Sequence, residues 1–197
     1  MPAPAAGSSQ APISAIVLCG GTSRRMGGLD KTRALLGPST VLDHLLDTMP
    51  PDWHVVCVGE QRATTRAVGW RRESPPGGGP VAGIATGLLA MDSPVCVVVG
   101  GDMPFAAAAV ASLVDALNAD TGLAAVLASD PDGRTQPLLA AYRTEALRSA
   151  LPHEPRGARL MAVVETLTIA TLECEARITL DVDTPEALEE ARHIVGA

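Results

Sequence analysis

The chain has 197 residues, a length typical of one domain, and a net charge of −7 argues against a broad basic face for binding nucleic acid. Hydrophobic residues make up 47% of the chain but aromatic residues only 2%, so the core must be built mainly from Ala, Val and Leu. We expect a flexible N-terminal tail, residues 1–12, followed by a single domain, residues 13–197.

The sequence shows no targeting or membrane segment. The first twelve residues are mostly Ala, Pro, Ser and Gly, without the charged and apolar regions of a secretory signal. The apolar runs are all shorter than a membrane span. The four cysteines form no C-x-x-C pair, and Cys19, Cys57 and Cys96 lie in or beside apolar runs, as small core residues do. We therefore expect a cytoplasmic protein that is not associated with a membrane.

The first predicted element is a buried strand, residues 13–18, followed by a glycine-rich stretch at 18–31 with the sequence L-C-G-G-T-S-R-R-M-G-G-L-D-K. Glycine lets backbone N–H groups approach a ligand, and successive N–H groups form an anion-binding nest. Arg24, Arg25 and Lys31 can neutralise the charge of a triphosphate. The alternative, a solvated surface turn, needs only about two to five residues. The stretch therefore favours a phosphate-binding loop.

Two common phosphate loops do not fit this stretch. The dinucleotide fingerprint G-x-G-x-x-G fails because Thr22 stands two residues after Gly20. The pattern G-x-x-x-x-G-K-[ST] fails because Met26 stands five residues after Gly21. A dinucleotide-dependent oxidoreductase is therefore disfavoured.

The stretch resembles L-A-G-G-x-x-x-R-M-G-G-x-D-K, the signature of the molybdenum-cofactor guanylyltransferases (MobA-like nucleotidyltransferases). Cys19 stands where that family more often has Ala, which is also small and apolar. The predicted fold is a three-layer α/β/α sandwich with a Rossmann-like, mainly parallel sheet, similar to the nucleotide-diphospho-sugar transferases.

The next segments predict a βαβ unit. Ser39 or Thr40 is a suitable N-cap for a helix that ends before Pro50. His44 is expected on its solvated face. A strand at 53–58 follows, so the two strands should be parallel with a right-handed crossover. A further short strand is expected within 67–72.

Residues 73–80, E-S-P-P-G-G-G-P, exclude regular structure and are interpreted either as a disordered linker or as a loop close to a ligand. Pro80 should open a helix at 81–91. The related proteins carry an acidic residue and then a G-P-L-A-G-like stretch that lines the nucleotide base. Here these positions are Glu73, one methylene longer than the usual Asp, and Gly79-Pro80-Val81-Ala82-Gly83.

The β-branched run at 95–99 predicts a central strand, which ends in Gly100-Gly101-Asp102-Met103-Pro104. A carboxylate just beyond a central parallel strand lies where open α/β sheets bind ligands, and its oxygens suit Mg²⁺. Alternatively, Asp102 caps a helix at 106–118. The residues G-D-M-P match the family motif C/G-D-x-P, whose Asp binds magnesium.

The second half of the chain continues the α/β pattern. The stretch Q-P-L-L-A-A-Y resembles a family strand, Q-P-L-x-A-L-Y. Arg156 and Arg159 lie in a polar segment that faces the second substrate in similar proteins, where they are either contacts to the pterin phosphate or ordinary surface arginines. We expect strands at 124–128, 136–142, 166–172 and 178–182, a turn at 130–133 and a helix at 144–151.

The last motif is D-V-D-T-P-E at 181–186. Thr184 as N-cap and Pro185 at the first helical position predict a helix through about residue 194. Helix capping would explain most of this pattern. However, Asp181 and Asp183 should point the same way on a strand, and the family shows D/N-x-D/N-T-P-E here. Asp183 is therefore a second candidate magnesium ligand.

The resemblance implies transfer of GMP from GTP to the phosphate of molybdenum-bound molybdopterin, with release of pyrophosphate. It assigns charge stabilisation to Lys31 and Arg25, and Mg²⁺ binding to Asp102 and Asp183. It also implies hand-over of the product to molybdoenzyme chaperones or apoenzymes. The remaining nucleotide-binding candidates are Leu18, Cys19, Gly20, Gly21, Gly59, Glu73, Gly79 and Pro80.

Two other readings remain open. One is a sister transferase that uses CTP or a different phosphorylated acceptor, although cytidylyl relatives more often begin L-A-A-G. The other is a non-catalytic nucleotide-binding partner in cofactor assembly, which would be expected to lose some of the charged motif residues retained here.

Overall fold

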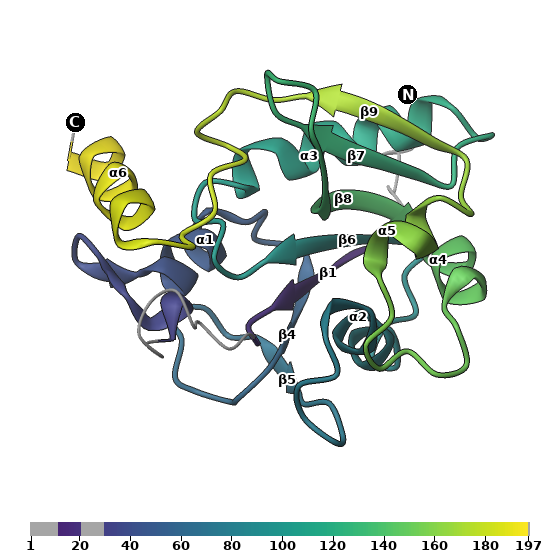
Figure 1. Ribbon diagram of the computed structural model, residues 1–197, viewed down its shortest axis with the longest axis horizontal. Helices are drawn as coiled ribbons and strands as arrows, with labels where there is room; N and C mark the ends of the chain where they lie inside the picture. Colours follow the sequence, from purple (N-terminus) through teal and green to yellow (C-terminus); the bar gives the residue numbers. More distant parts are fainter. Residues whose placement is uncertain (1–11, 21–29, 197) are drawn as a thin grey trace, which may run out of the picture.

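The computed structural model describes residues 12–20 and 30–196, and a seven-stranded sheet runs through its centre (Figure 1). The strand order is β5-β4-β1-β6-β8-β7-β9. The first four of these are mutually parallel, β8 is antiparallel to both of its neighbours, and β7 and β9 are parallel. The expected mainly parallel sheet is confirmed. The strands are β1 (Ile13–Leu18), β4 (His54–Val58), β5 (Gly69–Arg71), β6 (Val95–Gly100), β7 (Ala125–Ser129), β8 (Thr135–Arg143) and β9 (Ile169–Glu173).

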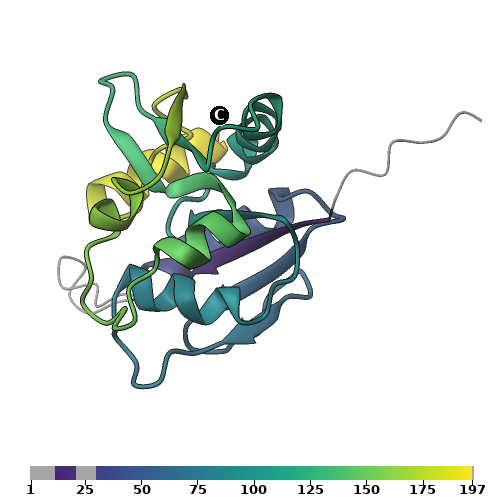
Figure 2. The same cartoon turned by 90° about the vertical axis from the view of Figure 1, so that its right-hand side faces the viewer.

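Helices cover both faces of the sheet, which gives the three expected layers. One buried cluster joins α1 and α3 to one face, and another joins α2, α4 and α5 to the opposite face. In Figure 2, α2 and α4 lie side by side against the sheet. The helices are α1 (Val41–Thr48), α2 (Pro80–Leu88), α3 (Ala107–Ala119), α4 (Thr144–Ala150), α5 (Leu160–Val164) and α6 (Pro185–Gly196).

Helix α1 forms where its capping residue predicts it. The Oγ1 atom of Thr40 accepts a hydrogen bond from the backbone N–H of Asp43 at 3.1 Å, and the apolar face packs on the sheet. The expectation that His44 is simply solvated is wrong. Its ring is half-buried and meets Phe105 edge-on at 5.4 Å, and this burial lowers the pKa of the imidazole.

The strand expected at 178–182 is absent; this stretch is turn and irregular backbone. Its apolar residues are buried without a sheet, because Val182 packs fully buried in a cluster with α6 and Leu36. The backbone N–H of Val182 donates to the carbonyl of Asp102 at 2.9 Å instead of to a neighbouring strand. The two aspartates at 181 and 183 therefore do not share a strand face, and the N–H of Asp183 donates to the carbonyl of Asp181.

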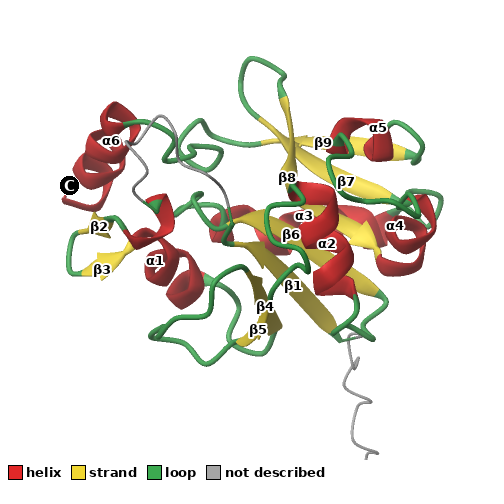
Figure 3. Ribbon diagram, turned by 60° about the horizontal axis from the view of Figure 1, so that its bottom comes forward, coloured by secondary structure: helices red, strands yellow, loops and turns green. Residues whose placement is uncertain are grey.

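The short elements between β1 and α1 were not predicted from the sequence. A 3-10 helix, η2 (Lys31–Arg33), is followed by the antiparallel pair β2 (Leu35–Leu36) and β3 (Ser39–Thr40), which turns at Gly37 with a φ of 63°. Two-residue strands are too short to show a hydrophobic period. This small pair lies against α1 and α6 (Figure 3). Within the described ranges, no helix has the length and apolar character needed to cross a membrane.

Candidate active site

The predicted site residues gather at one edge of the sheet. Strands β1, β4, β5 and β6 are parallel, so their carboxyl ends meet on the same side (Figure 1). Cys19 directly follows β1, Gly59 follows β4, Glu73 comes just after β5, and Asp102 comes just after β6. Three further predicted residues, Gly21, Arg24 and Arg25, lie outside the described residues.

Close backbone packing fixes the start of the glycine-rich loop. The N–H of Cys19 donates to the carbonyl of Val58 at 2.8 Å, and the N–H of Gly101 donates to the carbonyl of Leu18 at 2.9 Å. A Cβ on Gly59 would lie 3.0 Å from the backbone carbon of Cys19, and one on Gly101 would lie 3.0 Å from the oxygen of Leu18. Both glycines are therefore needed for this approach, because backbone atoms cannot move aside cheaply.

Cys19 itself is a core residue. A hydrogen bond with the Cys57 thiol, together with burial, holds the pKa of the Cys19 thiol well above its ordinary value. The group is therefore neutral near pH 7. Gly20, the next residue, is exposed, and a Cβ there would meet nothing within 4 Å.

Lys31 lies between the two candidate metal ligands. Its Nζ is 3.5 Å from Oδ2 of Asp102 and also pairs with Oδ1 of Asp183. Burial raises the pKa of Asp102 and the nearby charge of Asp181 adds to this, while Lys31 opposes the shift without cancelling it. A Cβ on Gly100 would lie 2.7 Å from Oδ1 of Asp102, so the glycine leaves room for this carboxylate. The arrangement gathers two negative groups around one cation.

Asp102 does not have the helix-capping role considered as an alternative, whereas the predicted N-cap of α6, Thr184, is confirmed. Helix α3 is preceded by Ala106 and has no side-chain cap, so Asp102 does not cap it. At α6 the capping atom is Oγ1 of Thr184, which accepts from the N–H of Ala187 at 3.2 Å. The side chain of Asp183 faces Lys31 instead.

Glu73 lies inside the loop that leads to α2. Its Oε2 accepts a hydrogen bond from the N–H of Gly78 at 2.6 Å. A Cβ on Gly83 would lie 3.2 Å from Oε1 of Glu73 and 3.0 Å from Cδ2 of Leu18. Gly79 precedes the helix with a φ of 89°, and Pro80 is its first residue, as predicted. Leu18 and Glu73 therefore both lie next to Gly83, in the helix that Gly79 and Pro80 begin.

Residues 15–170 match the family of MobA-like NTP transferase domains. The chain belongs to that family.

Two curated relatives carry more specific names. The chain is 32% identical to a probable molybdenum cofactor guanylyltransferase of Natronomonas pharaonis, over 90% of this chain and 95% of the relative. It is 37% identical to a molybdenum cofactor guanylyltransferase of Mesorhizobium japonicum, over 72% of this chain and 71% of the relative.

Solved structures confirm the fold of this MobA-like domain. The molybdopterin-guanine dinucleotide biosynthesis protein A of Archaeoglobus fulgidus superimposes with a TM-score of 0.71 at 22% identity, covering 93% of this chain and 98% of the other. The 2-C-methyl-D-erythritol 4-phosphate cytidylyltransferase of Thermus thermophilus superimposes with a TM-score of 0.70 at 17% identity, covering 92% and 98%. A molybdopterin-guanine dinucleotide biosynthesis protein and a cytidylyltransferase thus share this fold, so the fold alone does not determine the nucleotide base.

The segment expected to face the second substrate borders the loop that precedes α2. The N–H of Gly157 donates to the carbonyl of Gly78 at 2.7 Å. The neighbouring Arg156 is exposed, and its Cγ would be 3.7 Å from a Cβ on Gly78. The contact of this arginine with a substrate stays a prediction.

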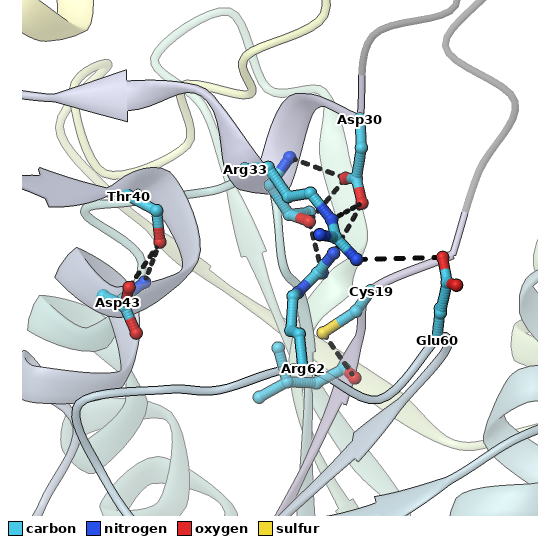
Figure 4. Close-up of polar contacts among 9 residues, drawn as sticks. Cys19, Asp30, Arg33, Thr40, Asp43, Glu60 and Arg62 are labelled. Carbon is cyan, nitrogen blue, oxygen red and sulfur yellow. Dashed lines mark hydrogen bonds and ion pairs between the residues drawn. The ribbon is translucent and has the colours of Figure 1, made fainter.

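Sequence reasoning missed Arg62, which lies on the loop between β4 and β5. Its guanidinium pairs with Asp30 (Figure 4) and donates to Thr32, and these two residues flank Lys31 in the sequence. Burial alone would raise the pKa of Asp30, but hydrogen bonds from Thr32 and the charge of Arg62 outweigh burial, so the pKa is lowered overall. The carboxyl is therefore ionised at neutral pH. The one available sequence signal was an arginine soon after the carboxyl end of a predicted strand.

Proposed function

We propose that this nucleotidyltransferase transfers GMP from GTP to the phosphate of molybdopterin and releases pyrophosphate. The observation that carries the proposal is the contact of Lys31 with Asp102 and Asp183, at the sheet edge where a glycine-rich loop begins. The names of the relatives at 32% and 37% identity support the guanylyl donor and the molybdenum-cofactor acceptor.

The chemistry suits a site without a nucleophilic side chain. An oxygen of the acceptor phosphate attacks the α-phosphorus of GTP, and the bond to the bridging oxygen of pyrophosphate breaks. The nucleophile is already an anion, so no protein base is needed to activate it. The protein must instead align two negatively charged reactants and stabilise the charge on the leaving pyrophosphate.

The residue roles follow from position and charge. Lys31 supplies positive charge at the phosphates, and Arg25 is expected to do the same. Backbone N–H groups of Gly20 and Gly21 are expected to hold the β- and γ-phosphates. The residues proposed to surround base and ribose are Leu18, Gly59, Glu73, Gly79 and Pro80.

Asp102 and Asp183 are the proposed ligands of Mg²⁺. Both carboxylates contact the same ammonium group, so their oxygens lie within reach of a single cation. Mg²⁺ usually takes one or two carboxylates together with substrate phosphates and water. Across residues 12–20 and 30–196 no three His, Cys, Asp or Glu side chains form a metal site, so phosphate oxygens would complete this one. Bound Mg²⁺ would neutralise charge on those oxygens.

The product of the proposed reaction, a guanine dinucleotide cofactor, must be delivered to the enzymes that use it. We expect molybdoenzyme chaperones or apoenzymes in the cytoplasm to receive it.

Calorimetry of GTP and CTP binding, with Mg²⁺ present, tests the donor and the metal together. We expect the wild-type protein to select GTP and Asp102→Ala to lose most of that binding. Pyrophosphate release with molybdopterin present then tests transfer. CTP selectivity would change the product, and no binding of either triphosphate would contradict the proposal. Binding without pyrophosphate release would favour a non-catalytic partner.

A further inference from the structure

Arg62 is a buried cation whose guanidinium reaches two residues at once. Its side chain is only 10% exposed. Nη1 pairs with Oδ2 of Asp30 (Figure 4), and Nη2 donates to Oγ1 of Thr32. The guanidinium also lies 5.6 Å from the centre of the Trp70 ring. Nε is buried without a hydrogen-bond partner, so the side chain is held through its outer nitrogens.

The two residues that Arg62 holds lie on either side of Lys31. Oδ1 of Asp30 accepts from the backbone N–H of Thr32 at 3.1 Å and from its Oγ1 at 2.6 Å. These bonds close the first turn of η2, the three-residue 3-10 helix that carries Lys31. Such a short helix gains little stability from its own hydrogen bonds. Its orientation must therefore come from contacts with the rest of the protein.

We propose that Arg62 is a positioning residue for Lys31. By holding Asp30 and Thr32 together, it fixes η2 so that the Lys31 ammonium meets Asp102 and Asp183. This inference rests on the proposed function. It requires an arginine, because a planar fork can bond two acceptors and stack on a ring at the same time, whereas a lysine ammonium cannot.

A nearby arginine provides a matched control. Arg66 lies in the same segment, but its guanidinium donates to backbone carbonyls at the end of α1 and in the loop after it. It holds that helix end and has no hydrogen bond or ion pair with η2 among the described residues. Its acceptors are the carbonyls of Leu46, Met49, Pro50, Pro51 and Trp53, at 2.8 to 3.2 Å.

A double-mutant cycle separates positioning from general stabilisation. Arg62→Ala, Lys31→Ala and the double variant are compared by kcat/KM for GMP transfer, well below their melting temperatures. We expect Arg62→Ala to lower kcat/KM by roughly 10- to 100-fold in the wild-type background, as loss of an orienting partner does. In the Lys31→Ala background it should cost less than about threefold, because the residue it positions is gone. Equal losses in both backgrounds would overturn the proposal.

Three further variants distinguish a positioning role of Arg62 from a general effect on stability. Arg66→Ala should lower the melting temperature while kcat/KM changes by less than about twofold. Arg62→Lys should recover only part of the activity lost in Arg62→Ala, and full recovery would argue against the two-acceptor fork. If Arg62→Ala does not fold, Thr32→Val removes one acceptor at nearly constant volume. It should show the same dependence on Lys31, and a loss that is independent of Lys31 would overturn the proposal.

The cycle also distinguishes this inference from the function on which it rests. If the wild-type protein binds GTP but transfers no GMP, the proposed function fails, and the same four variants are compared by their GTP dissociation constants. Coupling between Arg62 and Lys31 in binding would then still support the positioning role. Additive changes in binding would reject it.

Discussion

At the scale of single residues, the ammonium of Lys31 lies at the centre of this site, because three distant parts of the chain meet there. It pairs with Asp102 after β6 and with Asp183 before α6. Burial raises the pKa of Asp102, which means that the ionised form is costly there and depends on a nearby cation. The same cationic site that stabilises the carboxylates can therefore stabilise phosphate charge.

Replacement of Lys31 by alanine should remove this stabilisation where charge develops. We expect Lys31→Ala to lower kcat/KM for GMP transfer at least about 100-fold, or roughly 3 kcal/mol, as for other preorganised charge contacts. Pyrophosphate release gives the measurement. Arg177→Ala is the control, because Arg177 lies after β9 with its side chain 57% exposed, and its ion pair is with Glu175. Full turnover by Lys31→Ala would exclude the assigned role.

At the scale of elements, the glycines of α2 control how closely that helix packs on the sheet. A Cβ on Gly87 would lie 2.8 Å from Cγ2 of Ile16, which is fully buried on β1. Gly83 faces Leu18 in the same way at 3.0 Å. Small residues on this helix face therefore bring the loop before α2 close to the end of β1.

Gly87→Ala tests this packing. Alanine should favour the helix by about 1 kcal/mol, but overpacking against a buried side chain costs about 1–3 kcal/mol. We expect the free energy of unfolding to fall by roughly 1 kcal/mol, measured by urea denaturation. Gly196→Ala in α6 is the control, since a Cβ there meets nothing within 4 Å and should not destabilise. A higher stability for Gly87→Ala would show that the helix shifts freely.

Most of the sheet could be predicted because hydrophobic periodicity and turn residues mark its strands, but the connections to the site could not. The alternation at 178–182 is genuine, yet Val182 is buried against α6 rather than in a sheet, and local pattern cannot distinguish these outcomes. Motif residues such as Asp102 were found because charged groups at strand ends are conspicuous. Arg62 was missed because its importance comes from contacts with Asp30 and Thr32 that only the fold creates.

At the scale of the whole molecule, two buried clusters on opposite faces of the sheet contain all four cysteines, each as a free thiol. Burial raises the pKa of the Cys96 thiol to about 11. Burial also raises the pKa of Cys174, although that group is less enclosed. The folded protein therefore binds thiol protons more tightly than the unfolded chain does.

This difference predicts loss of stability in alkali. Below pH 9 both states keep the Cys96 proton, so its full contribution is present. Between pH 9 and about 11 the unfolded chain ionises first, which should lower the free energy of unfolding by roughly 1 kcal/mol at pH 10 for this thiol. Urea denaturation of wild type and Cys96→Ala at pH 8 and pH 10 measures the effect. An identical pH dependence in the two proteins would count against it.

The pairing of Lys31 with Asp183 spans 152 positions of the chain. During translation, β1, β4 and β6 with α1 to α3 can come together before the later segments leave the ribosome. The carboxylate pair, however, is incomplete until Asp183 has emerged and the following helix has docked. A nascent or truncated polypeptide would therefore hold much of the core while the candidate active site is still incomplete. We therefore expect full activity only from a chain whose synthesis has continued through Asp183 and the helix that follows it.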